Sequence, residues 1–300
     1  MPLSVVVPAH DAAPTVAAAV RSALRQTCPP DEVVVVDDGS TDATPTVVAS
    51  LGGPVRLVSQ PQGGPSAARN AGVAASSGNW VAFLDADDEW HPEKLEHQLG
   101  AADDDVVLVA TDWARELVTS PVPRPLPTSV LTTSEILVLN RFQTSTVLLC
   151  RDAFFGAGGF DPSLDGVEDW DLWLRVSRQG RVVKLDWPFV RYTDVATGYS
   201  KALERVYRTG LAMLRRELGD PPVGDGRAVM AWHHLRFALA YLLAHDRRAA
   251  RACLAELGEA GLADAVPQAA VRHLLPFLAG RARRRVERTF KPAALTTSRR

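Results

Sequence analysis

Short apolar runs alternate with helix-like stretches along the first third of the chain. The continuous apolar run at residues 33–36 and the mainly apolar stretches at 3–7 and 55–58 predict strands. Residues 13–26 and a stretch ending near Ser50 predict helices between them. Strands that are apolar on both faces and are joined by helices indicate right-handed crossovers and a parallel sheet. We therefore expect an α/β, Rossmann-like fold with a mostly parallel sheet flanked by helices.

Acidic residues follow two of the predicted strands. Residues 33–36 lead into Asp37 and Asp38, and the run at residues 80–84 leads into the sequence Asp-Ala-Asp-Asp at 85–88. Ligands of parallel α/β sheets bind beyond the carboxyl ends of the strands. Carboxylate oxygens suit Mg²⁺ or Mn²⁺, which usually also bind substrate phosphate. The alternative for residues 85–88 is a helix start, where Asp is favoured.

Two further stretches each leave a functional and a structural interpretation open. The Gly-Gly turn at residues 62–66 precedes a helix that carries Arg69, which favours phosphate binding or, equally, a plain loop with a salt-bridged arginine. The proline-rich residues 119–129 predict a loop, either an acceptor-side flap or a connection.

An acidic helix start is predicted at residues 167–176. Acidic side chains near a helix N-terminus favour a structural role. Trp170 and Trp173, however, are three residues apart and can share a face with a carboxylate, an arrangement that suits stacking on a sugar. A place in the core is the alternative for both, and the expected one for Trp173.

The chain changes character near residue 200. From there the pattern predicts helices at about 200–218, 227–244, 247–260 and 267–288. We expect two domains, an α/β domain over residues 1–198 and an all-α C-terminal domain over residues 199–300 that ends in a basic tail. The tail predicts a solvated charged face, with peripheral contact to an anionic membrane surface as the alternative.

Composition narrows the class of protein. The 300 residues carry a formal charge of −2 and are 46% hydrophobic, which gives no indication of nucleic acid as a partner. Three distant cysteines predict neither a disulfide framework nor a metal knuckle. No apolar run is long enough to span a membrane. We expect a cytoplasmic protein, with the inner membrane face as a peripheral alternative. Its oligomeric state is open.

Five motifs in one order carry a family resemblance. They are Ser-Val-Val-Val-Pro-Ala-His at 4–10, Asp-Asp-Gly-Ser-Thr-Asp at 37–42, Gly-Gly-Pro-Ser-Ala-Ala-Arg-Asn at 63–70, Asp-Ala-Asp-Asp at 85–88 and Glu-Asp-Trp-Asp at 168–171. Together they resemble the nucleotide-sugar glycosyltransferases of family 2, which have the GT-A fold. The resemblance covers about residues 3–195.

The resemblance implies a donor site. Asp38 would hydrogen-bond the base of the nucleotide, near Pro8 and Ala9 at the end of the first strand. Asp85 would lie near the ribose, and Arg69 would lie close to the same site. By family frequency the nucleotide would be UDP, with dTDP and GDP as alternatives.

The resemblance also implies a metal and a catalytic base. Asp87 would bind Mn²⁺ or Mg²⁺ bridging the diphosphate, and Asp169 would be the general base. Glu168 and Trp170 are expected on the acceptor side. The histidine that many relatives place after the last strand is missing here, and Asp194 is the expected substitute.

The implied activity is single-displacement, inverting transfer of a sugar to a hydroxyl of a glycan, lipid-linked or small-molecule acceptor. A catalytically silent nucleotide-sugar or glycan-binding module, a nucleotidyltransferase and a docking function of the helical region are the alternatives. The first predicted turn lacks G-x-G-x-x-G, which argues against an NAD-dependent dehydrogenase. Family members that extrude polymers carry Q-x-x-R-W, which is absent, so non-processive transfer is expected. The Ala- and Arg-rich composition suggests a high-GC bacterium and cell-wall, exopolysaccharide or natural-product glycosylation.

Overall fold

The structure, a computed structural model, describes residues 1–118, 120–193 and 202–275. Contacts divide the chain into two units, Met1–Thr209 and Gly210–Arg300. The domain boundary expected between residues 198 and 199 falls outside the described residues. Asp194 and the basic tail also lie outside them.

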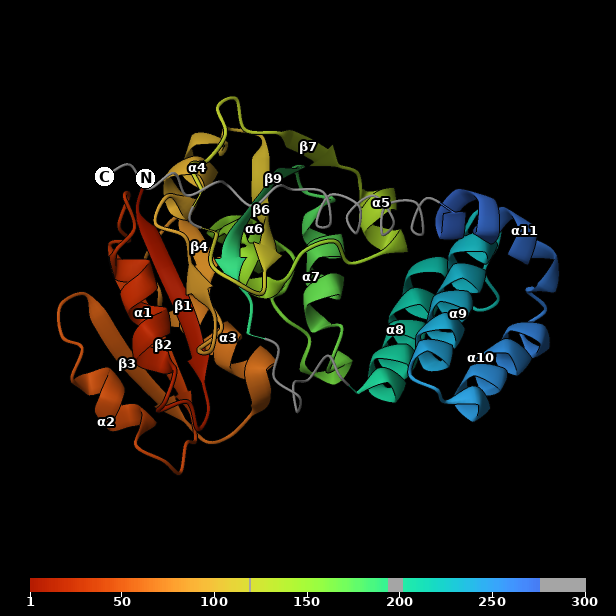
Figure 1. Ribbon diagram of the computed structural model, residues 1–300, viewed down its shortest axis with the longest axis horizontal. Helices are drawn as coiled ribbons and strands as arrows, with labels where there is room; N and C mark the ends of the chain where they lie inside the picture. Colours follow the sequence, from red (N-terminus) through yellow and green to blue (C-terminus); the bar gives the residue numbers. More distant parts are fainter. Residues whose placement is uncertain (119, 194–201, 276–300) are drawn as a thin grey trace, which may run out of the picture. The chain divides into compact units, whose positions relative to one another are not determined.

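One sheet forms the centre of the first unit (Figure 1). Among the described residues nine strands build it in the order β3-β2-β1-β4-β8-β6-β9-β5, and β7 also pairs with β9. The strands are β1 Leu3–Ala9, β2 Glu32–Asp38, β3 Val55–Gln60, β4 Trp80–Phe83, β5 Glu89–Trp90, β6 Val106–Ala114, β7 Thr128–Leu131, β8 Leu148–Cys150 and β9 Arg181–Arg191.

The strands β1, β2, β3 and β4 are parallel, so their carboxyl ends lie at the same edge of the sheet. β1 is parallel to β2 and β4, and β2 is parallel to β3. β8 runs antiparallel between β4 and β6, whereas β6 and β9 are parallel to each other. The α/β prediction is therefore confirmed, but the sheet is mixed beyond β4, because β8 enters it in the opposite direction and β5 and β7 pair antiparallel with β9.

Helices cover both faces of this sheet (Figure 1). Val5 and Ala82 share a core with residues of α1 and α4. Val6 lies against Gly72 of α3, and the Phe83 ring packs against rings of α6 and α7. The helices of this unit are α1 Val16–Leu24, α2 Thr44–Ala49, α3 Gly64–Ala75, α4 Lys94–Gly100, α5 Thr133–Val138, α6 Arg151–Gly156 and α7 Glu168–Val176.

The sequence explains these elements locally. All seven residues of β2 are buried, as expected for a β-branched strand covered on both faces. In α1 the buried residues recur at helical spacing, at Val16, Ala19, Val20 and Ala23, so one stripe of the helix faces the sheet. The predicted strands and helices of the first hundred residues are confirmed within a few positions.

Helices make up most of the second unit over its described residues, 210–275. α8 Leu203–Leu218 crosses the division between the units, and α9 Gly226–Leu243, α10 Arg247–Glu259 and α11 Val266–Ala269 follow it. The helical C-terminal region is thus confirmed as far as residue 275. In the described part of the chain, no helix has the length and apolar character needed to cross a membrane.

Candidate active site at the carboxyl edge of the sheet

Asp38, the last residue of β2, has a carboxylate held by three N–H groups. The backbone N–H groups of Gly63 and Gly64 donate to its two oxygens at 2.8 Å each, and Gln60 Nε2 donates at 2.7 Å. A carboxylate offers roughly four acceptor positions. One acceptor position of this carboxylate therefore has no hydrogen bond among those described, and Asp38 is 5% exposed.

The Gly-Gly turn has a structural role in this arrangement. Its N–H groups point at Asp38 and so are engaged within the protein. Of the two interpretations of residues 62–66, the structure favours the loop that fixes a carboxylate over a phosphate cradle.

Pro8 and Ala9 lie at the same edge. In the parallel register of β1 and β2, Pro8 pairs with Val36 and Ala9 with Asp37. The end of β1 therefore lies beside the residue that precedes Asp38. The structure brings these three predicted donor-site residues together.

Residues 85–88 form a turn after β4, not the start of a helix. The N–H of Asp88 donates to the carbonyl of Asp85 at 3.1 Å. Ser145 holds this turn, since its hydroxyl accepts the N–H of Asp85 at 3.0 Å and donates to Asp88 Oδ2 at 2.6 Å. The turn presents its carboxylates at the edge where β1 and β2 also end.

Arg69 joins two parts of the site. Its guanidinium is buried in α3 and donates to Asp85 Oδ1 at 2.8 Å and to Glu168 Oε1 at 3.2 Å. Burial lowers the pKa of Arg69, but the charges of Asp85 and Glu168 outweigh burial, so the pKa lies above its ordinary value. Arg69 is thus a permanent cation between the turn after β4 and the start of α7.

Asp87 and Asp88 differ in what surrounds them. Asp88 is 1% exposed and accepts the backbone N–H of Thr193 at 2.9 Å. Burial, followed by the charge of Asp85, raises the pKa of Asp88 to about 8. Asp87 is half-buried, and the same two causes raise its pKa. Asp87 is therefore the accessible carboxylate of this pair.

One carboxylate of the turn, Asp87, is a candidate ligand for a divalent ion. Within residues 1–118, 120–193 and 202–275, no three His, Cys, Asp or Glu side chains form a group able to hold a metal. Burial and a neighbouring negative charge disfavour an ionised Asp87, and a cation would offset both. The donor set suits Mg²⁺ or Mn²⁺, which complete their coordination with substrate phosphate and water.

Asp169 lies in the first turn of α7 and accepts two hydrogen bonds. Asn140 Nδ2 donates to its Oδ2 at 2.9 Å, and the N–H of Trp170 donates to its Oδ1 at 2.6 Å. Burial and the charge of Glu168 raise the pKa of Asp169 to about 7, although the hydrogen bond from Asn140 opposes this. A carboxylate with such a pKa can accept a proton near neutral pH.

The burial of Trp170 disfavours the expected stacking of its ring on an acceptor sugar. Trp170 is 2% exposed, and its indole N–H donates to the carbonyl of Ile136 in α5. The ring therefore packs between α5 and α7 and has no face open to a sugar. Trp173 is fully buried and packs against the ring of Phe83 from β4, as expected for a core residue. Glu168 is also buried and serves as the partner of Arg69.

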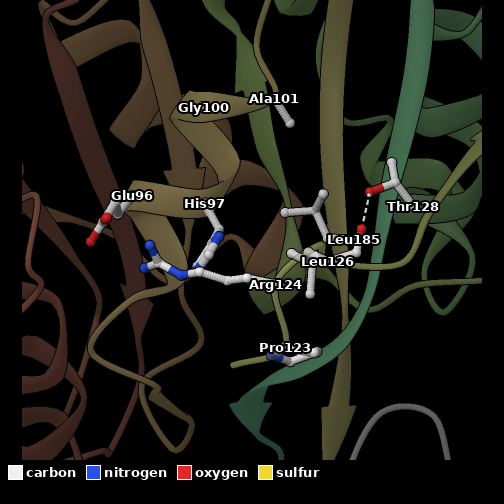
Figure 2. Close-up of a pocket in the computed structure, with 9 residues that line it drawn as sticks. All are labelled: Glu96, His97, Gly100, Ala101, Pro123, Arg124, Leu126, Thr128 and Leu185. Carbon is white, nitrogen blue, oxygen red and sulfur yellow. Dashed lines mark hydrogen bonds between the residues drawn. The ribbon is translucent and has the colours of Figure 1, made fainter. Parts of the chain in front are cut away.

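A hollow of about 490 Å³ lies elsewhere, on the face covered by α4 (Figure 2). The proline-rich loop contributes Pro123, Arg124 and Leu126 to it, opposite His97. Val122 of this loop is buried in the core shared with α1 and α4. Val122 therefore anchors the loop to this core, and the hollow contains none of the predicted site residues. The remaining lining residues are Glu96, Gly100, Ala101, Thr128 and Leu185.

Three residues of the site were not predicted from the sequence: Ser145, Asn140 and Thr193. Each makes one hydrogen bond to a carboxylate distant in the sequence. Ser145 had the clearest indication of a role in the sequence, because it belongs to the polar stretch 143–146, just before the apolar residues that lead into β8. A single hydroxyl or amide in a loop is otherwise indistinguishable from a solvated one.

Comparison with known proteins decides the family. Residues 4–160 match the family described as Glycosyl transferase family 2. The chain belongs to glycosyltransferase family 2. The predicted family is thereby confirmed, and the motifs at residues 37–42, 63–70 and 85–88 fall inside the matched range.

Two curated relatives of this family 2 chain come from bacteria. "Succinoglycan biosynthesis protein ExoO" of Rhizobium meliloti (strain 1021) is 45% identical over 109 residues, which cover 36% of this chain and 31% of the relative. An uncharacterized glycosyltransferase of Rickettsia prowazekii (strain Madrid E) is 30% identical over 188 residues, which cover 59% and 58%. The chain spans less than two thirds of the length of either relative.

Solved structures confirm the GT-A type of fold. TarS 1-349 of S. aureus in complex with UDP-GlcNAc has a TM-score of 0.61 at 21% identity, covering 79% of this chain and 72% of that one. Mannosyltransferase PcManGT from Pyrobaculum calidifontis, in complex with GDP-Man and Mn²⁺, has a TM-score of 0.60 at 21% identity, covering 92% and 80%. At this identity the similarity establishes the fold alone.

Proposed function

We propose that this chain transfers a sugar from a nucleoside-diphosphate sugar to a hydroxyl acceptor, with inversion at the anomeric carbon. The observation that carries this proposal is the buried Arg69, which joins Asp85 in the turn after β4 to Glu168, the neighbour of Asp169 at the start of α7. Asp38 ends the parallel strand β2 at the same edge of the sheet as this turn. Membership of family 2 and the donors bound by the two structural neighbours support it.

In this proposal the donor lies across the ends of β2, β1 and β4. The remaining acceptor position of Asp38 takes an N–H of the base, beside Pro8 and Ala9, and Asp85 lies near the ribose. UDP is the proposed nucleotide. A Mn²⁺ or Mg²⁺ ion held by Asp87 would stabilise the negative charge that develops on the leaving diphosphate.

Asp169 carries the proposed proton transfer. An acceptor hydroxyl is a weak nucleophile, so Asp169 takes its proton as the oxygen attacks the anomeric carbon. The carbon–oxygen bond to the diphosphate breaks, and the nucleoside diphosphate leaves with the electron pair. Attack opposite the leaving group inverts the centre. Asn140 orients Asp169 through its hydrogen bond. Arg69 forms an ion pair with Glu168, the residue that directly precedes Asp169.

The first test is a thermal-shift screen of UDP, dTDP, GDP and CDP with Mn²⁺, Mg²⁺ or EDTA. A ligand that binds only the folded state raises Tm with its concentration. We expect a metal-dependent shift with UDP. The absence of a shift with every nucleotide, in folded protein, contradicts the proposal.

Turnover with the nucleotide sugar chosen by that screen then separates transfer from binding alone. Inverted configuration of the product, read by NMR, supports the single displacement, and retained configuration contradicts it. Binding without any turnover favours the silent binding module.

A further inference from the structure

A lysine side chain lies inside the core of the first unit. Lys94, the first residue of α4, is 0% exposed. Within the residues that the structure describes, no carboxylate pairs with its Nζ, and burial holds the pKa of Lys94 well below its ordinary value. Moving an amine out of water costs free energy unless other groups compensate. The contacts of Nζ therefore indicate what this side chain does.

Two side chains contact the Nζ of Lys94. Nζ donates to Gln98 Oε1 at 2.7 Å and lies 4.0 Å from the centroid of the Trp90 ring. Both contacts suit an amine, since an amide oxygen accepts a hydrogen bond and an indole face attracts a cation. Gln98 and Trp90 are themselves buried. Lys94 therefore fixes the positions of two buried side chains.

Trp90 and Gln98 donate to two consecutive backbone carbonyls just before β8. Trp90 Nε1 donates to the carbonyl of Ser145 at 2.8 Å. Gln98 Nε2 donates to the carbonyl of Thr146 at 2.9 Å. A carboxamide has its acceptor and its donor on opposite sides, so the hydrogen bond from Lys94 to Oε1 keeps Nε2 turned toward the carbonyl. The side chain of Lys94 thus orders both donors that hold this backbone.

The backbone held in this way supports the acidic turn at residues 85–88. Ser145 Oγ accepts the N–H of Asp85 at 3.0 Å and donates to Asp88 Oδ2 at 2.6 Å. Groups that fix the backbone of Ser145 also fix where its hydroxyl lies. The placement of the turn, and of Asp87 within it, therefore depends on contacts that begin at Lys94.

We propose that Lys94 is a positioning residue for the turn at residues 85–88. It acts through Trp90 and Gln98 on the backbone that presents the Ser145 hydroxyl. This inference rests on the proposed function for the role of the turn in metal-dependent donor binding. Removing a group that orients metal ligands typically lowers metal affinity by about 10–100-fold. A lysine that only filled the core would change stability without changing how nucleotide affinity depends on the metal.

Lys94→Met tests the proposal, because methionine keeps an unbranched apolar stem and removes the Nζ donor. In the full chain without metal or nucleotide, we expect amide hydrogen exchange at residues 85–88 to become about tenfold faster, since the N–H of Asp85 donates to Ser145. Mass spectrometry measures this exchange. Calorimetry with UDP should give a Kd about tenfold higher in Mn²⁺ and within about twofold of the wild-type value in EDTA.

Trp90→Phe is a second variant that tests the same connection. It keeps a ring beside Nζ and removes the N–H that the carbonyl of Ser145 accepts, so exchange and Kd should change in the same direction. Gln26→Leu is the matched control. Gln26 is 5% exposed and forms buried hydrogen bonds with the backbone around the start of α4, but none with Trp90 or Gln98. Its removal should leave exchange at residues 85–88 and both Kd values unchanged.

The outcomes separate this proposal from the transferase proposal. Unchanged exchange at residues 85–88 in either folded variant overturns the positioning role, as does an unchanged Kd in Mn²⁺ for a chain that binds UDP. An equal rise of Kd in EDTA, or equal effects of Gln26→Leu, also overturns it, because the turn is then not the specific target. Faster exchange in both variants of a chain that no nucleotide stabilises sustains the positioning of the turn while the transferase proposal fails.

Discussion

At the scale of single residues, the position of Asp169 makes activity depend on pH. Its pKa is raised to about 7 by burial and by the charge of Glu168. A general base must be unprotonated, so we expect kcat/KM to fall about tenfold per pH unit below that value. A pH profile of kcat/KM checks this. A profile that stays flat between pH 5 and 8 would assign the proton transfer to another group.

Asp169→Asn should separate activity from folding. Asn140 Oδ1 is buried and has no hydrogen-bond partner, so a flipped Asn140 amide can accept from the new amide at position 169. We expect turnover to fall by about 10²–10⁴. Because the pKa of Asp169 is higher in the folded state than in the unfolded chain, its protonated form contributes to folding stability at low pH. That contribution is lost as pH rises through about 7. The variant should therefore match or exceed the wild-type Tm at pH 8, and a lower Tm contradicts the argument.

Asp87 belongs to the metal-dependent part of donor binding. We expect Asp87→Asn to weaken nucleotide affinity in Mn²⁺ by about tenfold or more, since a carboxylate ligand is lost. Titration calorimetry with and without Mn²⁺ measures this. Asp103→Asn is the control, because Asp103 is 61% exposed and pairs with Arg181 at the start of β9, away from the carboxyl edge. Equal loss of affinity in EDTA would show that Asp87 acts without a metal.

At the scale of secondary-structure elements, α3 is held close to the sheet by Gly72. A Cβ at this position would lie 2.3 Å from Val6 Cγ1, a side chain in the middle of β1. We expect Gly72→Ala to lower the free energy of unfolding by about 1–3 kcal/mol through overpacking. Urea denaturation measures the change.

Gly100 provides the matched control for this prediction. It ends α4, and a Cβ there would meet nothing within 4 Å. Gly100→Ala should be neutral or more stable by about 0.5–1 kcal/mol, because alanine restricts the unfolded chain. Equal effects of the two substitutions would contradict the close packing of α3.

The sequence predicts elements better than their arrangement. The β-branched run of β2 and the helical spacing in α1 are local signals, and both elements form as expected. The antiparallel insertion of β8 between β4 and β6 depends on contacts between distant residues, which no local pattern encodes. The burial of Trp170 was not predicted, for a related reason. A spacing of three residues shows that Trp170 and Trp173 share a side of the helix, but not which side the sheet covers.

At the scale of the whole molecule, every predicted site residue within the described range belongs to the first unit. We therefore expect UDP with Mn²⁺ to slow amide hydrogen exchange at residues 60–70 and 85–88. Exchange in α9 of the second unit should not change. Mass spectrometry of the full chain checks both. Protection in α9 of similar size would mean that donor binding involves the helical unit.

The buried cation of Arg69 has a consequence for how the family can diverge. Its guanidinium is neutralised by Asp85 from one element and Glu168 from another, 99 residues from Arg69 in the chain. Removing one member of a buried ion-pair group leaves an uncompensated charge and costs about 3–5 kcal/mol. A homologue that loses only one of the three residues is therefore destabilised by about that amount. The three positions should therefore be retained or replaced together among homologous sequences, and an alignment in which Arg69 varies while both acids persist would show that some other cation takes its place.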